Sequence, residues 1–147
     1  MALVYLDNCA LQRPLDDRDQ FRVRVEADAV TAILAAVEEG TVRLVTSVAL
    51  RAESSRARNR SRRDFASRVL QLATEDVPLS EDARELQRQF EQAGLKPFDA
   101  LHLACAVAAR ADFFCTTDDR LFKRGRETNT QATRVVTPLE LAATLNL

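Results

Sequence analysis

The chain has 147 residues, 46% of them hydrophobic and 29% charged, with 21 basic and 22 acidic side chains. This length predicts one domain, residues 1–147, that buries roughly 70% of its extended surface, and only 3 Gly and 4 Pro exclude collagen-like and disordered classes. A net charge of -1 gives no general attraction for nucleic acid, so such binding would need local basic patches.

Neither export nor membrane anchoring is indicated by the sequence. The opening MALVYLDNCA lacks a basic region, and no stretch approaches the ~20 apolar residues that span a bilayer. We therefore expect a cytoplasmic protein with no membrane segment. The three cysteines, Cys9, Cys105 and Cys115, are odd in number and far apart, which argues against a disulfide framework or a zinc site and favours buried thiols.

The first third of the chain predicts a strand, a turn segment, a helix and a second strand. LVYL at residues 3–6 is an apolar run too short for a core helix, and polar residues follow it as a turn over residues 8–17. Apolar residues at helical spacing then predict a helix from Phe21 to Gly40, where the glycine ends it. The β-rich run at 42–47 is the second predicted strand.

The middle of the chain is predicted to be mostly helical. Helix-compatible segments cover residues 48–56 and 65–72, and residues 76–79 form a weak third strand. Ser80 is placed as the N-cap of a further helix, which ends at Gly94.

The last third completes an α/β pattern. An alanine-rich helix from Pro97 to Ala108 is apolar over most of its circumference, as expected of a helix packed on a sheet. Residues 113–116 and 134–137 are the last two strands, and a short helix begins at Leu139. Strands that alternate with helices predict a three-layer α/β/α fold with a parallel sheet of about five strands, for which we expect the order 3-2-1-4-5.

Four carboxylates are candidates for one common site. Asp7 follows the first strand, Glu53 the second and Asp118 the fourth, at the edge where open α/β sheets bind ligands. Asp99 begins the alanine-rich helix. Each acid alone has a structural alternative, as a helix cap, a turn residue or an exposed charge. If all four converge, their mutual repulsion requires a cation, and oxygen ligands alone select Mg²⁺ or Mn²⁺ rather than zinc.

These acids lie in motifs that resemble the four acidic motifs of the PIN domain, the nuclease fold of VapC-type toxins. The motifs are YLDN at 5–8, Ser47 with Glu53, FDALHLA at 98–104 and TTD at 116–118, in order over nearly the whole chain. The opening YLDNCALQRPLDD is similar to that of a subgroup of stand-alone PIN proteins, whereas many of the toxins carry Thr or Ser at the position of Asn8.

The resemblance implies an endoribonuclease that depends on Mg²⁺ or Mn²⁺ and needs no protein nucleophile, because the metal activates water. It also implies a homodimer and a cognate antitoxin as partner, with RNA as substrate. The residues that the resemblance assigns to metal binding and catalysis are Asp7, Glu53, Asp99 and Asp118. Side chains expected to orient phosphate or water beside the metal are Asn8, Thr116 and Asp119.

Strand geometry distinguishes the two adjacent acids at 118 and 119. Side chains alternate along an extended segment, so Thr116 and Asp118 point to one side and Asp119 to the other. We therefore expect Asp118 in the site and Asp119 as a cap for the segment from Arg120 to Lys123.

Two basic clusters, within residues 51–63 and 120–126, would follow an RNA backbone if they border the site. The alternative for each is a solvated helix face or loop. The candidates for RNA contact are Arg51, Arg56, Arg58, Arg60, Arg120, Lys123 and Arg124.

His102, the only histidine, lies on the same side of its helix as Asp99. We favour a packing role over that of a catalytic base, because metal activation of water leaves little for an imidazole to do.

Two other functions fit the same fold. One is a catalytically silent PIN-like binding module, against which the presence of all four acids argues. The other is a phosphotransfer domain with Asp7 as nucleophile. It would need a second acid close to Asp7 or a lysine after a late strand, and neither is found.

Overall fold

The computed structural model describes all 147 residues and contains one five-stranded sheet in the order β3-β2-β1-β4-β5. Every pair of neighbouring strands is parallel, which confirms the predicted α/β class and strand order. The strands are β1 Leu3–Leu6, β2 Arg43–Ser47, β3 Glu75–Val77, β4 Phe113–Cys115 and β5 Arg134–Val136. The helices are α1 Asn8–Leu11, α2 Phe21–Glu38, α3 Val48–Ser55, α4 Arg60–Leu70, α5 Glu81–Gln92, α6 Pro97–Ala108, α7 Asp119–Arg126 and α8 Pro138–Thr144, with a 3-10 turn, η1, at Arg13–Leu15.

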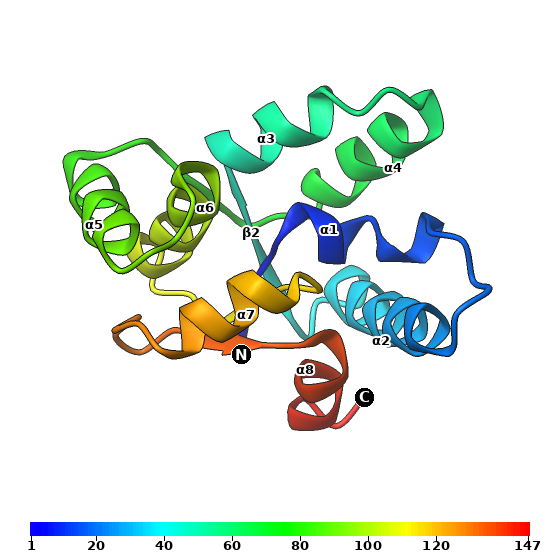
Figure 1. Cartoon of the computed structure of the whole chain (residues 1–147). Coiled ribbons are helices and arrows are strands. Elements are labelled where there is room, and N and C mark those ends of the chain that lie inside the picture. The colour runs from blue at the N-terminus through cyan, green and yellow to red at the C-terminus, as the bar shows by residue number, and fades with distance from the viewer.

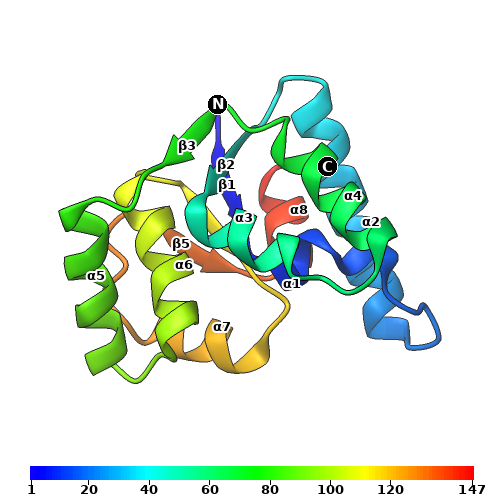
Figure 2. The same ribbon diagram turned by 90° about the horizontal axis from the view of Figure 1, so that it is seen from above.

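Helices cover both faces of the sheet. Alternate side chains of β1 enter different cores, with Leu3 and Tyr5 on one face and Val4 and Leu6 on the other. The first core is closed by α5 and α6, and the second by α1, α2, α4 and α8. Both views of the ribbon place α5 and α6 on one side of the strands and α2 and α8 on the opposite side (Figures 1 and 2).

The observed elements differ most from the predicted ones before residue 18, in α4 and after residue 118, and other strand and helix ends differ by one or two residues. The helix α4 begins at Arg60, whereas the predicted segment began at residue 65. Residues 8–17, expected to be a turn, contain α1 and η1, and residues 119–126 form a full helix, α7. The third strand ends at Val77 rather than at Leu79, since Pro78 has no N–H to donate to a sheet ladder.

A helix follows each strand at the carboxyl edge of the sheet, directly after β1, β2 and β5 and after a short loop for β3 and β4. The N-caps at this edge include Asp7 for α1, Ser47 for α3 and Asp118, three residues past the end of β4, for α7. The Asp7 N–H donates to the carbonyl of Cys115 (2.9 Å), which keeps the ends of β1 and β4 side by side. Helix N-termini and candidate acids therefore gather at one place in the fold.

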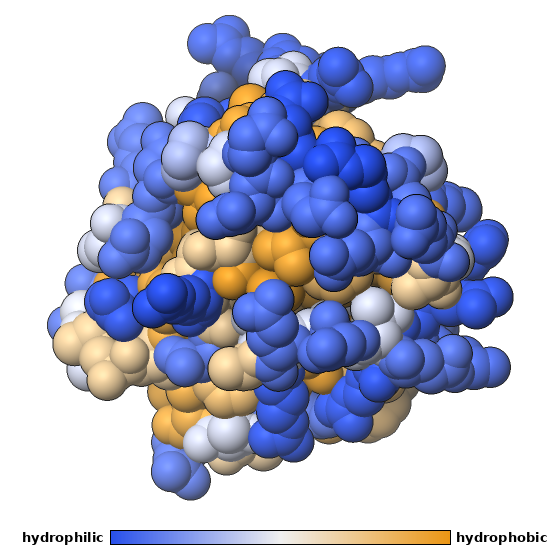
Figure 3. All heavy atoms as spheres, turned by 90° about the vertical axis from the view of Figure 1, so that its left-hand side faces the viewer, coloured by the Kyte–Doolittle hydropathy of each residue, from blue (hydrophilic) through white to orange (hydrophobic).

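The surface is mainly polar. Figure 3 shows one side of the molecule covered mostly by hydrophilic residues, with apolar areas between them. Large exposed hydrophobic side chains are few, and Phe21 at the start of α2 is 73% exposed. None of the helices combines the length and the apolar character needed to cross a membrane.

Candidate functional site

Asp7 is buried at the centre of the carboxyl edge, with only 6% of its surface exposed. Its Oδ1 accepts the Asn8 N–H (2.9 Å), and its Oδ2 accepts the hydroxyl of Thr116 (3.0 Å) and the thiol of Cys9 (3.2 Å). Burial raises the pKa of Asp7, and this effect outweighs the lowering by His102 and by the hydrogen bonds from Cys9 and Thr116. A cation beside Asp7 would offset the cost of holding this carboxylate ionised.

Cys9 serves Asp7 as a neutral donor. Burial and the charge of Asp7 raise the pKa of the Cys9 thiol to about 12, so the sulfur keeps its proton at neutral pH. Cys9 is partly exposed, which corrects the expectation that all three thiols are buried; Cys105 and Cys115 are buried as predicted. The difference arises because Cys9 lies at the open sheet edge and the other two lie in the cores.

His102 faces the acids from α6. Its side chain is 1% exposed, and its Nε2 lies 3.6 Å from Glu53 Oε1 without any hydrogen-bond partner. Asp7, Glu53 and His102 each offer one ligand atom, and these three atoms all lie within 4.8 Å of one another. The imidazole also packs against Phe98, with ring centroids 5.0 Å apart, so the packing role and the place in the site coexist.

Tyr5 and Ser47 fix the orientation of the imidazole. The Tyr5 hydroxyl lies 2.7 Å from His102 Nδ1 and 2.7 Å from Ser47 Oγ, deep between β1, β2 and α6. When Nδ1 carries the proton and donates it to Tyr5, the Nε2 lone pair points toward the acids. This hydrogen-bonded chain connects three of the four sequence motifs.

Asp99 and Asp118 complete the acidic group. Burial raises the pKa of Asp99, and the charges of Asp7 and Asp118 raise it further, which places all three carboxylates in one electrostatic field. Asp118 is exposed; its carboxylate accepts the N–H of Leu121 (3.0 Å) while its own N–H donates to Thr116 Oγ1 (3.1 Å). Asp99 and Asp118 therefore lie near Asp7, the most deeply buried of these acids, but the ligand atoms within 4.8 Å of one another belong to Asp7, Glu53 and His102.

Asp119 does not cap the helix, contrary to the expectation. Asp118 has the extended backbone of an N-cap and its carboxylate caps α7, whereas Asp119 is the first helical residue. Asp119 instead forms an ion pair with Arg22 of α2, at 2.7 Å. The helix therefore begins one residue earlier than the sequence pattern predicts.

A hollow of about 330 Å³ opens beside the acids. Glu53 and Asn8 line it, together with Arg56 from the end of α3. The Oδ1 atom of Asn8 is buried without a hydrogen-bond partner. Arg56 forms no ion pair, so its guanidinium is available to an anion in this hollow.

The basic candidates divide into free and paired side chains. Arg51 pairs with Asp76 (2.8 Å) and Arg60 with Asp64 (3.7 Å). The other candidates form no ion pair: Arg56, Arg58, Arg120, Lys123 and Arg124. The three on α7 line a separate hollow together with Asp119 and Glu127.

The residues present fit a divalent cation. An unpartnered, buried imidazole nitrogen and two carboxylates point to one position, which is the donor set of a metal site. The set contains nitrogen, so the expectation of oxygen ligands alone is incomplete. The sequence could not show which face of α6 turns toward the acids, although the spacing of Asp99 and His102 put both on one side of the helix.

Comparison with known proteins identifies the family and supports the fold. The model of the PIN domain family matches residues 4–127. The chain belongs to the PIN domain family. A chain in the crystal structure of VapBC2 from Rickettsia felis bound to a promoter DNA fragment has a similar fold. Its TM-score against this protein is 0.58, and the two sequences are 16% identical. The match covers 92% of this PIN domain and 98% of the Rickettsia chain. No curated protein matches the chain.

Proposed function

We propose that this PIN domain is an endoribonuclease that hydrolyses RNA phosphodiester bonds with Mg²⁺ or Mn²⁺ as cofactor. The observation that carries the proposal is the convergence of Asp7, Glu53 and His102 on one position, with the unpartnered Nε2 of His102 turned toward it. A divalent cation bound there supplies a Lewis acid and lowers the pKa of a water molecule, which removes the need for a protein nucleophile.

The protein's own side chains would hold the cation and bind the RNA backbone. Asp7 is held rigidly by three donors, and Glu53, Asp99 and Asp118 provide further carboxylates around it. Arg56 faces the hollow beside Glu53 and would bind a phosphate of the RNA backbone. Asn8 also lines the hollow, and its buried Oδ1 is an acceptor without a protein partner.

We further propose that the protein is the toxin of a type II toxin–antitoxin pair and acts in the cytoplasm as a homodimer. The similar fold in the VapBC2 structure supports a partner of the antitoxin kind. An antitoxin could neutralise the site by placing a guanidinium among the carboxylates. A strictly monomeric protein at micromolar concentration in light scattering would count against the dimer.

The decisive test is RNA cleavage by the purified protein with Mg²⁺, with Mn²⁺ and with EDTA. We expect cleavage only with a divalent cation, and none by the Asp7→Asn variant under any condition. Equal cleavage in EDTA would refute the metal mechanism. Binding of Mn²⁺ without cleavage of any RNA would instead support the catalytically silent binding module.

A further inference from the structure

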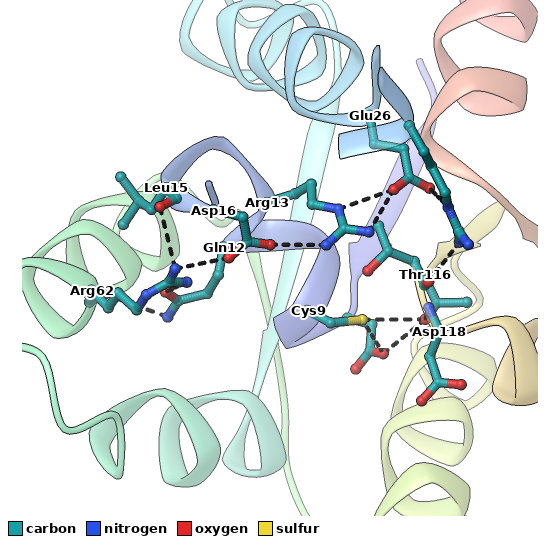
Figure 4. A network of polar contacts seen from close by, with 12 residues as sticks. Cys9, Gln12, Arg13, Leu15, Asp16, Glu26, Arg62, Thr116 and Asp118 are labelled. Carbon is teal, nitrogen blue, oxygen red and sulfur yellow. Dashed lines mark hydrogen bonds and ion pairs between the residues drawn. The ribbon is translucent and has the colours of Figure 1, made fainter. Parts of the chain in front are cut away.

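Six charged side chains of alternating sign form a continuous series of ion pairs along one side of the site. Figure 4 shows part of it, including Arg62, Asp16, Arg13 and Glu26. The ion pairs connect Arg62 to Asp16 (2.8 Å) and Asp16 to Arg13 (3.0 Å). They continue from Arg13 to Glu26, from Glu26 to Arg22 and from Arg22 to Asp119. This series of ion pairs therefore connects α4 to the first residue of α7.

Glu26 is the buried member of this series of ion pairs, with 6% of its surface exposed. Both of its oxygens are satisfied: Oε1 accepts Nε and Nη2 of Arg13 (3.0 and 2.7 Å), and Oε2 accepts Nε of Arg22 (3.3 Å). A buried carboxylate held by two guanidinium groups keeps its position, because losing these partners would leave an unpaired buried charge and destabilise the fold. Arg22 is thereby anchored to the body of α2.

The two terminal nitrogens of Arg22 hold the segment that carries Asp118. Its Nη1 and Nη2 donate to the two oxygens of Asp119 (2.9 and 2.7 Å), and Nη2 also donates to the carbonyl of Thr117 (3.1 Å). Hydrogen bonds from Arg22 hold the pKa of Asp119 below its usual range. Arg22 thus holds the residues on both sides of Asp118 and forms no hydrogen bond or ion pair with Asp118 itself.

Arg22 is not arranged to bind RNA. Three of its nitrogens already donate four hydrogen bonds to protein oxygens, out of the five N–H groups that a guanidinium has. We propose that Arg22 is a positioning residue of the metal centre, which fixes the segment 116–119 so that Thr116 reaches Asp7 and Asp118 reaches the metal. This inference depends on the proposed function for the role of the metal, but the mechanical link does not.

The test compares Arg22→Gln with three other variants. Arg22→Lys keeps the charge but has one nitrogen in place of three, so it should recover the wild-type behaviour only in part. Asp119→Asn removes the carboxylate and leaves the contact to the Thr117 carbonyl, so it should have a smaller effect. Arg88→Gln is the matched control, since it breaks an exposed Arg–Glu pair within α5.

Two measurements are made on each folded variant. The first is the affinity for Mn²⁺, followed by electron paramagnetic resonance of the free ion, which should fall about tenfold in Arg22→Gln and stay unchanged in Arg88→Gln. The second is amide hydrogen exchange in EDTA. The N–H groups of Asp118 and Leu121, which close the turn at the start of α7, should exchange faster in Arg22→Gln.

The outcomes separate this inference from the proposed function. Wild-type Mn²⁺ affinity and wild-type exchange in Arg22→Gln would overturn the role of Arg22 alone. Faster exchange with unchanged Mn²⁺ affinity would also overturn it, because the segment would then move without consequence for the site. If the wild-type protein bound no Mn²⁺, the metal mechanism would fail together with this role. If Arg22→Gln does not fold, Asp119→Asn, altered at an exposed residue, takes its place in both measurements.

Discussion

Asp7 and Asp118 occupy equivalent places in the sequence pattern and different places in the protein. Both follow a strand of the parallel sheet and both cap the helix that begins next. Asp7 is nearly fully buried and accepts three hydrogen bonds, whereas Asp118 is exposed and accepts one, from the Leu121 N–H. The same local pattern, an acid at a strand end, thus gives one fixed, desolvated carboxylate and one accessible carboxylate.

The difference in depth assigns different tasks to the two acids. Asp7 directly follows the central strand, where neighbours on both sides exclude water, and its charge is costly without a cation. Asp118 follows β4 at the rim and keeps contact with solvent, so it can adjust to a metal or to a phosphate at little cost. We therefore expect Asp7 to determine whether the metal binds, and Asp118 to modulate how tightly it binds.

The largest expected effect comes from neutralising the two acids one at a time. Asp7→Asn should weaken Mn²⁺ binding and slow RNA cleavage by at least about 100-fold, because its carboxylate is the buried centre of the donor set. Asp118→Asn should weaken both by roughly tenfold. Calorimetric titration of Mn²⁺ and single-turnover cleavage measure the two effects. Equal losses in both variants would show that depth does not separate these acids.

The next effect concerns His102, which adds nitrogen to the buried side of the site. His102→Gln should lower the affinity for Mn²⁺ about tenfold and that for Mg²⁺ much less, because imidazole suits transition metals whereas Mg²⁺ prefers oxygen. Tyr5→Phe, which removes the partner of Nδ1, should have the same sign and a smaller size. Competition between the two metals, measured for each variant, gives the ratio. If the ratio of Mn²⁺ to Mg²⁺ affinity is unchanged in His102→Gln, the histidine has only a packing role.

The burial of Asp7 also predicts a pH dependence of stability in EDTA. Because the folded-state pKa of Asp7 is raised, the folded protein favours its neutral form, and ionisation destabilises the fold increasingly as pH rises above the ordinary value near 4. The stability contributed by the neutral form is complete below that value and is lost as pH rises through the raised pKa. Asp7→Asn cannot ionise and should be more stable than wild type, by a margin that grows from pH 4 upward.

Denaturant unfolding of both proteins across this range measures the margin. Adding Mn²⁺ at neutral pH should reverse the order, since the metal stabilises only the chain that binds it. A margin that stays constant with pH would mean that Asp7 is not the group that titrates.

The strands and the acids could be predicted from sequence because both depend on local pattern. Short apolar runs such as 3–6 bounded by polar residues identify the strands, and the rule for parallel sheets brings Asp7 and Asp118 to one edge. Glu53 reaches that edge from within α3. The inward direction of His102 depends on how α6 packs, which periodicity cannot supply for a helix that is apolar nearly all round. The pair between Arg22 and Asp119 joins residues 97 positions apart, and nothing local indicates it.

The smallest expected effect concerns two arginines near the hollow beside the site. Arg56 and Arg62 both line it, but Arg62 is held by Asp16 and by the Leu15 carbonyl, whereas Arg56 is unpaired. Arg56→Ala should therefore reduce the slope of log affinity for RNA against log salt concentration by about 1, as expected when one phosphate contact is lost. Arg62→Ala should leave the slope unchanged and lower the unfolding free energy slightly, because its charge is already neutralised within the protein. Fluorescence anisotropy with a labelled RNA in EDTA, where cleavage is absent, measures both slopes. If Arg62→Ala flattens the slope as much as Arg56→Ala does, the ion pair with Asp16 opens when RNA binds, and the contrast between the free and the paired arginine does not hold.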